Sequence, residues 1–403
     1  MEAFVNRFIM LRKDNQVLSA YFQDKELIQV QADPYGTESI LGNIYVGKVK
    51  NIVKNINAAF IEIAGGQMCY YSLEENHHPI FSGRSAAGDA HPVRVGDELL
   101  VQVAREAVKT KAPVVTGNLN LTGRYVVLAH GHFGVGVSSK ITEPTVRERL
   151  KELAQTGLSD GFGLIVRTNA ETASEEEFVS ELASLKALYE KLCTQGVQRT
   201  CFSAVYRTPP AYLCALRDSY DALVDEIITD DTALHTEIQD YMKEYLPEEE
   251  RKLRLYQDKL LSLDHLYGIS HKISEALREK VWLKSGGNII IQPTEALTVI
   301  DVNTGKAIEG KKKAQETFRK MNLEAAAEIA KQIRLRNLSG IILIDFIDLE
   351  SDEAKKELLA ALDGLFRLDP VKTRLIDMTA LGLVEVTRKK IRRPLYEQLQ
   401  KNE

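Results

Sequence analysis

The C-terminal third of the chain alternates between apolar strand-like runs and helical runs, and this pattern constrains the fold more than any other feature. After Trp282 it reads GGNIIIQPTEALTVIDVN (strand-rich), ETFRKMNLEAAAEIAKQIRLRNL (helix), IILIDFIDL (strand), KKELLAALDGLF (helix) and TRLIDMT (strand). This order is typical of βαβ units, whose strands are parallel and buried. The sequence therefore predicts an α/β sheet in this region.

Acidic and amide side chains lie at the ends of two of these apolar strands. In TVIDVNTG (298–305), side chains alternate between faces, so Asp301 and Asn303 share one face while their apolar neighbours are buried on the other. Asp345 ends the apolar run of IILIDFIDL. Ligands collect beyond the carboxyl ends of parallel strands. We therefore expect Asp301 and Asp345 to converge across one strand spacing or two.

Two interpretations of these side chains are open. Two carboxylates and an amide form a hard-oxygen site suited to Mg²⁺, an ion that can polarise a phosphodiester and activate water. Alternatively, acidic residues at strand ends cap the next turn. Asp348 follows Asp345 by three residues. Two roles are open for Asp348: it replaces Asp345 as a ligand, or it recruits a second ion.

The upstream sequence predicts further α+β regions. Short strand-like runs occupy residues 4–32, and five or so Gly- and Asn-punctuated runs after Gly42 fit a small barrel. Residues 120–213 mix strands with the helical stretch EEEFVSELASLKALYEKL, and residues 214–277 read as mainly helical. The chain is therefore expected to be a multidomain α+β protein.

Charge is distributed unevenly along the chain. The net charge of −5 argues against a nucleic-acid partner if read alone. However, residues 218–250 carry 12 acidic residues and one basic residue, a local charge of −11, which leaves +6 on the other 370 residues. Five cations fall within the six residues 388–393. The total charge therefore does not exclude a phosphate-rich ligand.

Several protein classes are disfavoured by composition. The proportions of apolar residues (44%) and charged residues (27%) are those of a globular protein. Four cysteines show no CxxC spacing, which disfavours a disulfide framework or a structural zinc site. The N-terminus lacks a signal peptide core, and no apolar run is long enough for a membrane helix. We expect no membrane segment and a cytoplasmic location.

Three segments resemble the catalytic core of the ribonuclease E/G family. These are TVIDVNTG, NLEAAAEIAKQIRLRNLSGIILIDFIDL and MTALGLVEVTRKKIRRPL, in that order, and the resemblance continues upstream over nearly the whole chain. It implies an RNase H-like subdomain (1–40 and 214–277), an S1 domain of the OB type (41–119), a 5′-sensor subdomain (120–213) and a DNase I-like catalytic subdomain (278–398).

The resemblance also implies an activity. Asp301 and Asp345 match the aspartates that coordinate the catalytic Mg²⁺, and Asn303 matches the asparagine that assists them. The family cuts single-stranded RNA endonucleolytically and leaves a 5′-monophosphate and a 3′-hydroxyl. The chain is thus expected to be a Mg²⁺-dependent endoribonuclease of RNA processing and decay.

RNA contacts in the barrel follow from the same resemblance. Phe60 and Tyr70 fall where the family stacks aromatic rings on bases, although Tyr70 replaces a phenylalanine, and Lys111 matches a basic RNA contact. From its sequence context alone, NAAFIEI, Phe60 also fits a core position.

The family's pocket for a 5′-monophosphate is matched by GLIVRT (163–168). Arg167 and Thr168 are the candidate phosphate ligands, Gly123 and Val127 would line the pocket, and Arg374 would support it. A structural ion pair is the alternative role for Arg167. In the neighbouring turn, where the family often has a basic residue, this chain has Ser139.

The sequence departs from the family at its end. RRPLYEQLQKNE is not followed by the CPxCxG zinc link or the small dimerisation domain. No zinc-linked dimer is therefore predicted, and a homo-oligomer formed through other contacts is open. The rival hypothesis is a non-catalytic S1-type RNA-binding protein associated with ribosome or rRNA. The presence of Asp301, Asn303 and Asp345 together argues against this hypothesis. A DNA nuclease is a third, weakened by the S1-like barrel.

Overall fold

The chain forms two compact units. The computed structural model describes residues 5–36, 39–83, 92–107, 111–218, 224–305 and 311–400, with only the backbone for 311–313. One unit is Thr37–Ala222, and the other combines Met1–Gly36 with Leu223–Glu403. The first is therefore inserted into the sequence of the second.

A five-stranded sheet joins the two segments of the discontinuous unit, in the order β15-β14-β1-β2-β3. An antiparallel meander runs from β1 (Asn6–Lys13) through β2 (Gln16–Gln23) to β3 (Glu26–Pro34). Two short strands, β14 (Glu226–Thr229) and β15 (Leu253–Leu255), add in parallel. The N-terminal strands confirm the sequence prediction, whereas β14 and β15 lie in the region predicted to be mainly helical.

The helices near this sheet all come from the second half of the chain. They are α4 (Thr232–Tyr245), α5 (Leu263–Tyr267), α6 (Ile269–Ala276) and α9 (Leu395–Leu399). Phe22 and Ile228 share a hydrophobic core with Leu335 and Leu395. The sheet is therefore completed by residues near both ends of the sequence.

The inserted unit contains a closed five-stranded barrel of the OB-like type. Its strands are β4 (Ile44–Val53), β5 (Ala58–Glu62), β6 (Met68–Ser72), β8 (Val114–Thr116) and β7 (Glu98–Arg105). They pair in the order β4-β5-β6-β8-β7, and β7 closes back on β4, while β13 (Ala204–Tyr206) adds to the outside of β4. A Cβ at Gly47 would meet Ile61 at 2.5 Å, so any larger residue there would force the barrel interior to shift. The predicted small barrel is confirmed.

A four-stranded sheet with helices forms the rest of the inserted unit, as the mixed pattern predicts. Its order is β11-β12-β10-β9. The elements are β9 (Asn120–Thr122), β10 (Val126–His130), β11 (Val135–Val137), α1 (Pro144–Thr156), β12 (Phe162–Val166), α2 (Glu175–Thr194) and α3 (Ala211–Asp218). A capping box of Ser174 and Glu177 fixes the start of α2. Short 3₁₀ helices are η1 (Lys54–Ile56), η2 (Ala64–Gly66), η4 (Thr168–Thr172), η5 (Gly196–Gln198) and η6 (Pro247–Lys252).

The C-terminal sheet is mixed rather than wholly parallel. Its order is β16-β17-β18-β19-β21-β20, and only β18 and β19 pair in parallel. The strands are β16 (Lys280–Trp282), β17 (Asn288–Pro293), β18 (Leu297–Asn303), β19 (Gly340–Asp345), β20 (Thr373–Met378) and β21 (Leu383–Arg388). The predicted strands β18, β19 and β20 do run in the same direction, but the sheet is not wholly parallel, because antiparallel β17 pairs with β18 and antiparallel β21 inserts between β19 and β20.

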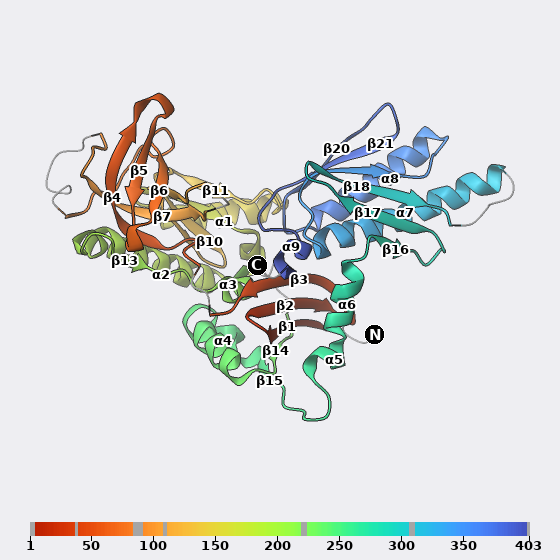
Figure 1. Cartoon of the computed structure of the whole chain (residues 1–403), viewed down its shortest axis with the longest axis horizontal. Coiled ribbons are helices and arrows are strands. Elements are labelled where there is room, and N and C mark those ends of the chain that lie inside the picture. Colours follow the sequence, from red (N-terminus) through yellow and green to blue (C-terminus); the bar gives the residue numbers. More distant parts are fainter. Residues whose placement is uncertain are drawn as a thin grey trace. The chain divides into compact units, whose positions relative to one another are not determined.

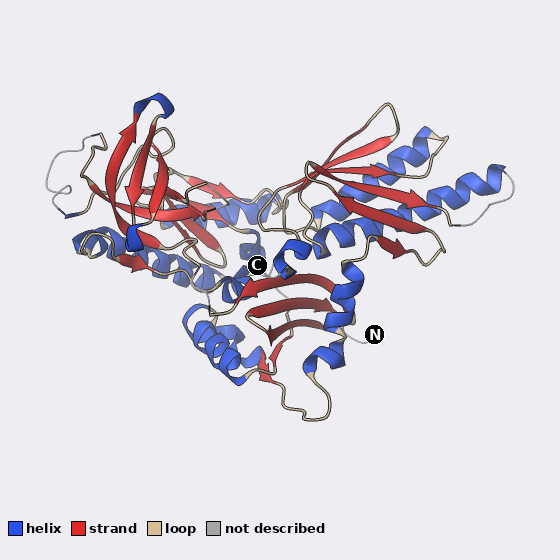
Figure 2. Ribbon diagram, in the orientation of Figure 1, coloured by secondary structure: helices blue, strands red, loops and turns tan. Residues whose placement is uncertain are grey.

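Two helices, α7 (Lys311–Leu335) and α8 (Asp352–Arg367), cover one face of this sheet (Figures 1 and 2). Ile300, Ile342 and Ile344 point into that core and are 0% exposed. Val299 and Ile341, on the other face, are 37% and 51% exposed. The expectation that these strands are buried was therefore correct for one face only, and the open face is the one that carries the polar side chains.

A buried ion pair ties the end of β21 to the loop after α8. Arg388 Nε donates to Asp369 Oδ2 at 2.7 Å, and Arg388 Nη1 donates to Asn337 Oδ1 and to the Leu338 carbonyl. The side chains of Arg388 and Asp369 are 2% and 6% exposed. Removing one partner leaves the other charge buried without compensation, which costs about 3–5 kcal/mol.

We therefore expect Asp369→Ala to lower the free energy of unfolding of this sheet by about 3–5 kcal/mol. Asp363→Ala removes the exposed partner of Arg367 and should cost about 1 kcal/mol or less. Denaturant unfolding followed by the fluorescence of Trp282, the single tryptophan, measures both variants, because Trp282 lies on β16. Equal losses in the two variants would contradict the prediction.

Candidate active site

Asp301 and Asp345 lie side by side at the ends of the two parallel strands. In the register of β18 and β19, Asp301 is the Cα partner of Asp345. The neighbouring Ile300 and Ile344 are buried, so strand alternation turns both carboxylates to the open face. The expected convergence is therefore confirmed at one strand spacing.

Asn303 belongs to the same group. Its Nδ2 donates to Asp301 Oδ2 at 2.7 Å. This bond uses one carboxylate oxygen of Asp301 and fixes the plane of that group. The other oxygen, Oδ1, has no hydrogen bond to any described residue.

The electrostatics of the group are those of uncompensated negative charge. Burial, followed by the charges of Asp301 and Asp348, raises the pKa of the Asp345 carboxyl above its ordinary value. Within the part of the chain that the structure describes, no Lys, Arg or His forms an ion pair with these three aspartates. A cation from outside the protein would therefore be favoured here.

The donor set fits a hard cation that keeps part of its water shell. Asp301 and Asp345 offer carboxylate oxygens, the ligands that Mg²⁺ prefers. Among the described residues, no cluster of three or more His, Cys, Asp and Glu side chains is arranged to hold a metal ion. The protein would then supply only a few ligands, as is common for Mg²⁺ and unlike a structural zinc site.

The barrel aromatics lie on the barrel's outer face. Phe60 on β5 is the register partner of Tyr70 on β6, and the rings meet edge to face with centroids 6.3 Å apart. Both are partly exposed, whereas Ala59, Ile61 and Tyr71 on the same strands are buried. Phe60 therefore does not take the core position. Lys111 is exposed and precedes β8, whose Val114 pairs with Tyr70.

Four of the residues assigned to the 5′ pocket lie together in the inserted unit. Arg167 and Thr168 follow β12, and the Arg167 N–H donates to the Tyr125 carbonyl. Arg167 Nη1 donates to the Gly123 carbonyl, and Thr168 Oγ1 lies 2.9 Å from Ser138 Oγ. Val127 shares the open face of β10 and β12 with partly exposed Arg167.

Two acidic residues that the sequence analysis missed surround Arg167. Asp218 Oδ1 accepts from Arg167 Nη1 at 2.8 Å, so the ion pair that the sequence left open is present. Glu181 accepts hydrogen bonds from three consecutive backbone N–H groups, those of residues 124–126, while burial raises the pKa of its carboxyl. A Cβ at Gly123 would lie 2.3 Å from Glu181, so Gly123 makes room for this carboxylate.

A sequence signal existed for Glu181. It falls between Phe178 and Leu182, on the apolar stripe of α2, where an acidic residue needs buried partners. Asp218 gives no comparable signal. Arg374 is exposed on β20 in the other unit. Ser139 is also exposed.

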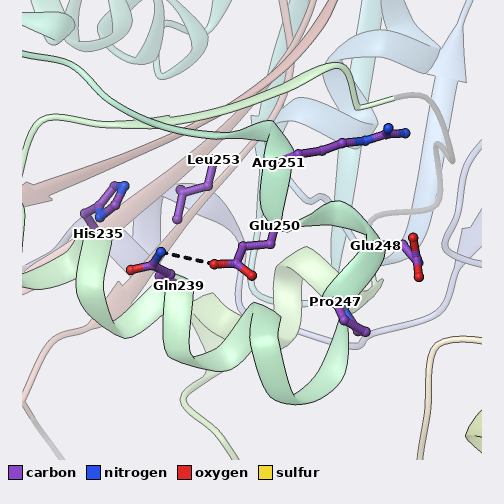
Figure 3. A pocket seen from close by; sticks show the side chains of 7 residues that line it. All are labelled: His235, Gln239, Pro247, Glu248, Glu250, Arg251 and Leu253. Carbon is purple, nitrogen blue, oxygen red and sulfur yellow. Dashed lines mark hydrogen bonds between the residues drawn. The ribbon is translucent and has the colours of Figure 1, made fainter.

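A shallow hollow of about 540 Å³ is lined by residues of α4, η6 and β15 (Figure 3). In it Gln239 donates to Glu250, while the side chains of Arg251 and Glu248 extend away from that pair. Its mixture of acidic and basic groups offers neither a carboxylate pair nor a phosphate cradle. We do not assign a role to it.

Known proteins are similar to this sequence over most of its length. The sequence model of the Ribonuclease E/G family matches residues 120–391. Ribonuclease G of Escherichia coli (strain K12) is 34% identical over 380 residues, 93% of this chain and 77% of that protein. Ribonuclease G of Haemophilus influenzae is 34% identical over 391 residues, 94% of this chain and 79% of that protein. Ribonuclease E of Nostoc sp. is 35% identical over 392 residues, 96% of this chain and 56% of that protein.

These similarities define the class of protein. The chain is an endoribonuclease. It belongs to the ribonuclease E/G family, which confirms the resemblance seen in its motifs, and this family in general consists of metal-dependent nucleases. Within the described residues, no helix is both long and apolar enough to cross a bilayer.

Burial of the Asp345 carboxylate and its repulsion by Asp301 and Asp348 predict a gain in stability when Asp345 is neutralised. The raised pKa of Asp345 means that its ionised form costs stability at neutral pH, and protonation at lower pH relieves this cost. We expect Asp345→Asn to raise the thermal midpoint of the metal-free protein by about 1–3 °C at neutral pH.

Added MgCl₂ should raise the thermal midpoint of the wild type but not that of Asp345→Asn. The control is Asp160→Asn, which neutralises an exposed aspartate that forms no hydrogen bond with any described residue. Scanning calorimetry measures all three proteins. A metal-free Asp345→Asn variant less stable than the wild type would contradict the electrostatic argument.

Proposed function

We propose that the chain is a Mg²⁺-dependent endoribonuclease that cuts single-stranded RNA and leaves 5′-monophosphate and 3′-hydroxyl ends. The observation that carries this proposal is the register pairing of Asp301 with Asp345 at the open ends of two parallel strands, where no described residue supplies a counter-charge. A nuclease needs a cation next to a polyanionic substrate, and this is where one would be held.

The proposed ligands are Asp301 and Asp345. Mg²⁺ bound there would activate a water molecule for in-line attack and neutralise charge on the phosphoryl group. The hydrogen bond from Asn303 to Asp301 Oδ2 orients this carboxylate, and Oδ1 is then available to bind the ion. Because β18 and β19 are locked in the sheet, the two carboxylates are preorganised and need little rearrangement to bind the ion.

RNA would be gripped by the barrel, which we interpret as an S1 domain. Phe60 and Tyr70 present partly exposed rings on its outer face. Stacking on a base contributes about 1–3 kcal/mol and tolerates any sequence, and Lys111 adds a cation for the backbone. This arrangement suits a single strand, whose bases are free to stack.

A 5′-terminal monophosphate would bind at Arg167. The Nη1 group is engaged by Gly123 and Asp218, whereas Nε and Nη2 have no hydrogen bond to any described residue. That edge of the guanidinium suits a bidentate contact with phosphate, and the Thr168 hydroxyl is one residue away. Ser139 stands where the family often has a basic residue, so this charge would be missing beside the phosphate.

The remaining assignments are also proposals. The subdomain boundaries, a role in rRNA, tRNA and mRNA processing and decay, and a cytoplasmic location follow from the family. The rival proposal is a non-catalytic RNA-binding protein, for which the barrel alone would suffice. The uncompensated carboxylates favour catalysis, since a binding protein gains nothing from negative charge beside RNA.

The first prediction of this proposal concerns cleavage. Asp301→Asn should lower cleavage of a fluorescent single-stranded A/U-rich RNA by at least about 100-fold, because even loss of an outer-shell partner costs about 10–100-fold. RNA affinity without Mg²⁺ should stay within about twofold of the wild type. Gel-based cleavage and fluorescence anisotropy measure the two quantities.

The matched control is Asp352→Asn, which neutralises an exposed aspartate at the start of α8. It should cut RNA at the wild-type rate. Cleavage by Asp301→Asn at the wild-type rate would refute the metal assignment, and absence of cleavage by the wild type would favour the binding-protein proposal.

The second prediction concerns the 5′ end. Arg167→Ala should abolish the preference for 5′-monophosphate over 5′-hydroxyl RNA, while cleavage of the 5′-hydroxyl substrate changes less than about threefold. Arg149→Ala removes the same charge from an exposed position on α1 and should keep the preference. The ratio of kcat/KM for the two RNAs measures the effect. A preference that survives Arg167→Ala would remove the sensing role.

A further inference from the structure

A buried asparagine of α7 holds the loop that carries the carboxylates. Asn322 is 1% exposed. Its Nδ2 donates to the Ile347 carbonyl at 2.7 Å, and its Oδ1 accepts from the Ile347 N–H at 3.1 Å. Both polar groups of one peptide residue are thus satisfied by a single side chain.

Ile347 lies in the loop between the two carboxylates Asp345 and Asp348, so its contact with Asn322 bears on their position. It lies two residues after Asp345 and one before Asp348, where the chain has left β19 and no ladder supplies backbone hydrogen bonds. Phe346 and Leu349 enter the core at 7% and 8% exposure, while Asp345 and Asp348 face outward. The loop is therefore anchored from beneath, with its carboxylates on the other side.

Asn322 is an unusual choice for its position unless the two bonds matter. It stands next to Met321 and one helical turn from Ala325 and Ala326, all of them in the hydrophobic core. An apolar residue there would leave the N–H and C=O of the partly buried Ile347 without this partner, at up to about 1–3 kcal/mol for each group. Asparagine pairs both groups at once.

We propose that Asn322 is a positioning residue of the metal site, which holds Asp345 and Asp348 at a fixed separation from Asp301. This inference rests on the proposed Mg²⁺ site. Asn322 does not touch the ion or the RNA. It acts through the Ile347 peptide, in the way that outer-shell partners orient the ligands of other metal sites.

The test uses Mn²⁺ as the probe, because its binding to the RNA-free protein is read directly by electron paramagnetic resonance. Asn322→Ala should weaken Mn²⁺ binding about 10-fold or more. In cleavage assays it should raise the Mg²⁺ concentration for half-maximal rate by a similar factor and leave KM for RNA unchanged. A merely structural role would lower the active fraction without moving either metal constant.

The matched control is Gln332→Ala on the same helix. Gln332 is 6% exposed, donates to Glu328 and accepts from Arg336, so this variant also removes two side-chain hydrogen bonds from α7. We expect it to lose stability and to bind Mn²⁺ like the wild type. Equal Mn²⁺ binding by Asn322→Ala and the wild type would overturn the positioning role.

Two further measurements complete the test. Asp301→Asn should lose Mn²⁺ binding; if it binds like the wild type, the metal site itself fails, and the positioning role falls with it. Hydrogen exchange of the wild type needs no variant. The Ile347 amide should exchange as slowly as the amides of β19, and fast exchange there would overturn the proposal even if Asn322→Ala does not fold.

Discussion

The parallel pairing of β18 with β19 is the constraint on which the site depends. A parallel pair needs a crossover, and α7 supplies it while covering one face of the sheet. The same connection leaves the opposite face open and brings Asp301 level with Asp345. Sheet hydrogen bonds thereby hold two like charges together that would separate in a flexible chain.

Strand alternation made part of this arrangement predictable from sequence. The period of two in TVIDVNTG assigned Asp301 and Ile300 to opposite faces, and the apolar run before Asp345 placed that residue at a strand end. The order of the strands was not predictable, because the β20–β21 hairpin is set by tertiary pairing of six-residue strands. The strands β14 and β15 were not predicted either, because they are too short to show a strand periodicity in the sequence.

Polar residues on apolar helix stripes are the signal that sequence reasoning underused. Glu181 on α2 and Asn322 on α7 both interrupt such a stripe, and each satisfies backbone groups of a neighbouring loop. Burying such a group without a partner is costly, so its presence implies a partner in the fold. The identity of that partner still required the structure, as did the contact between Arg167 and Asp218.

The discontinuous sheet has a consequence for how the chain reaches this fold. Arg7 on β1 pairs with Glu226 on β14, and Leu395 near the C-terminus joins the core of the same sheet. Such pairings close long loops, which is slow, whereas the inserted unit uses one contiguous segment. During synthesis the inserted unit is completed before β14 and β15 are made. Until then the antiparallel meander β1–β3 lacks its partner strands and stays exposed. The carboxylate site is then among the last parts to form, so incomplete chains would carry the barrel without the means to cut.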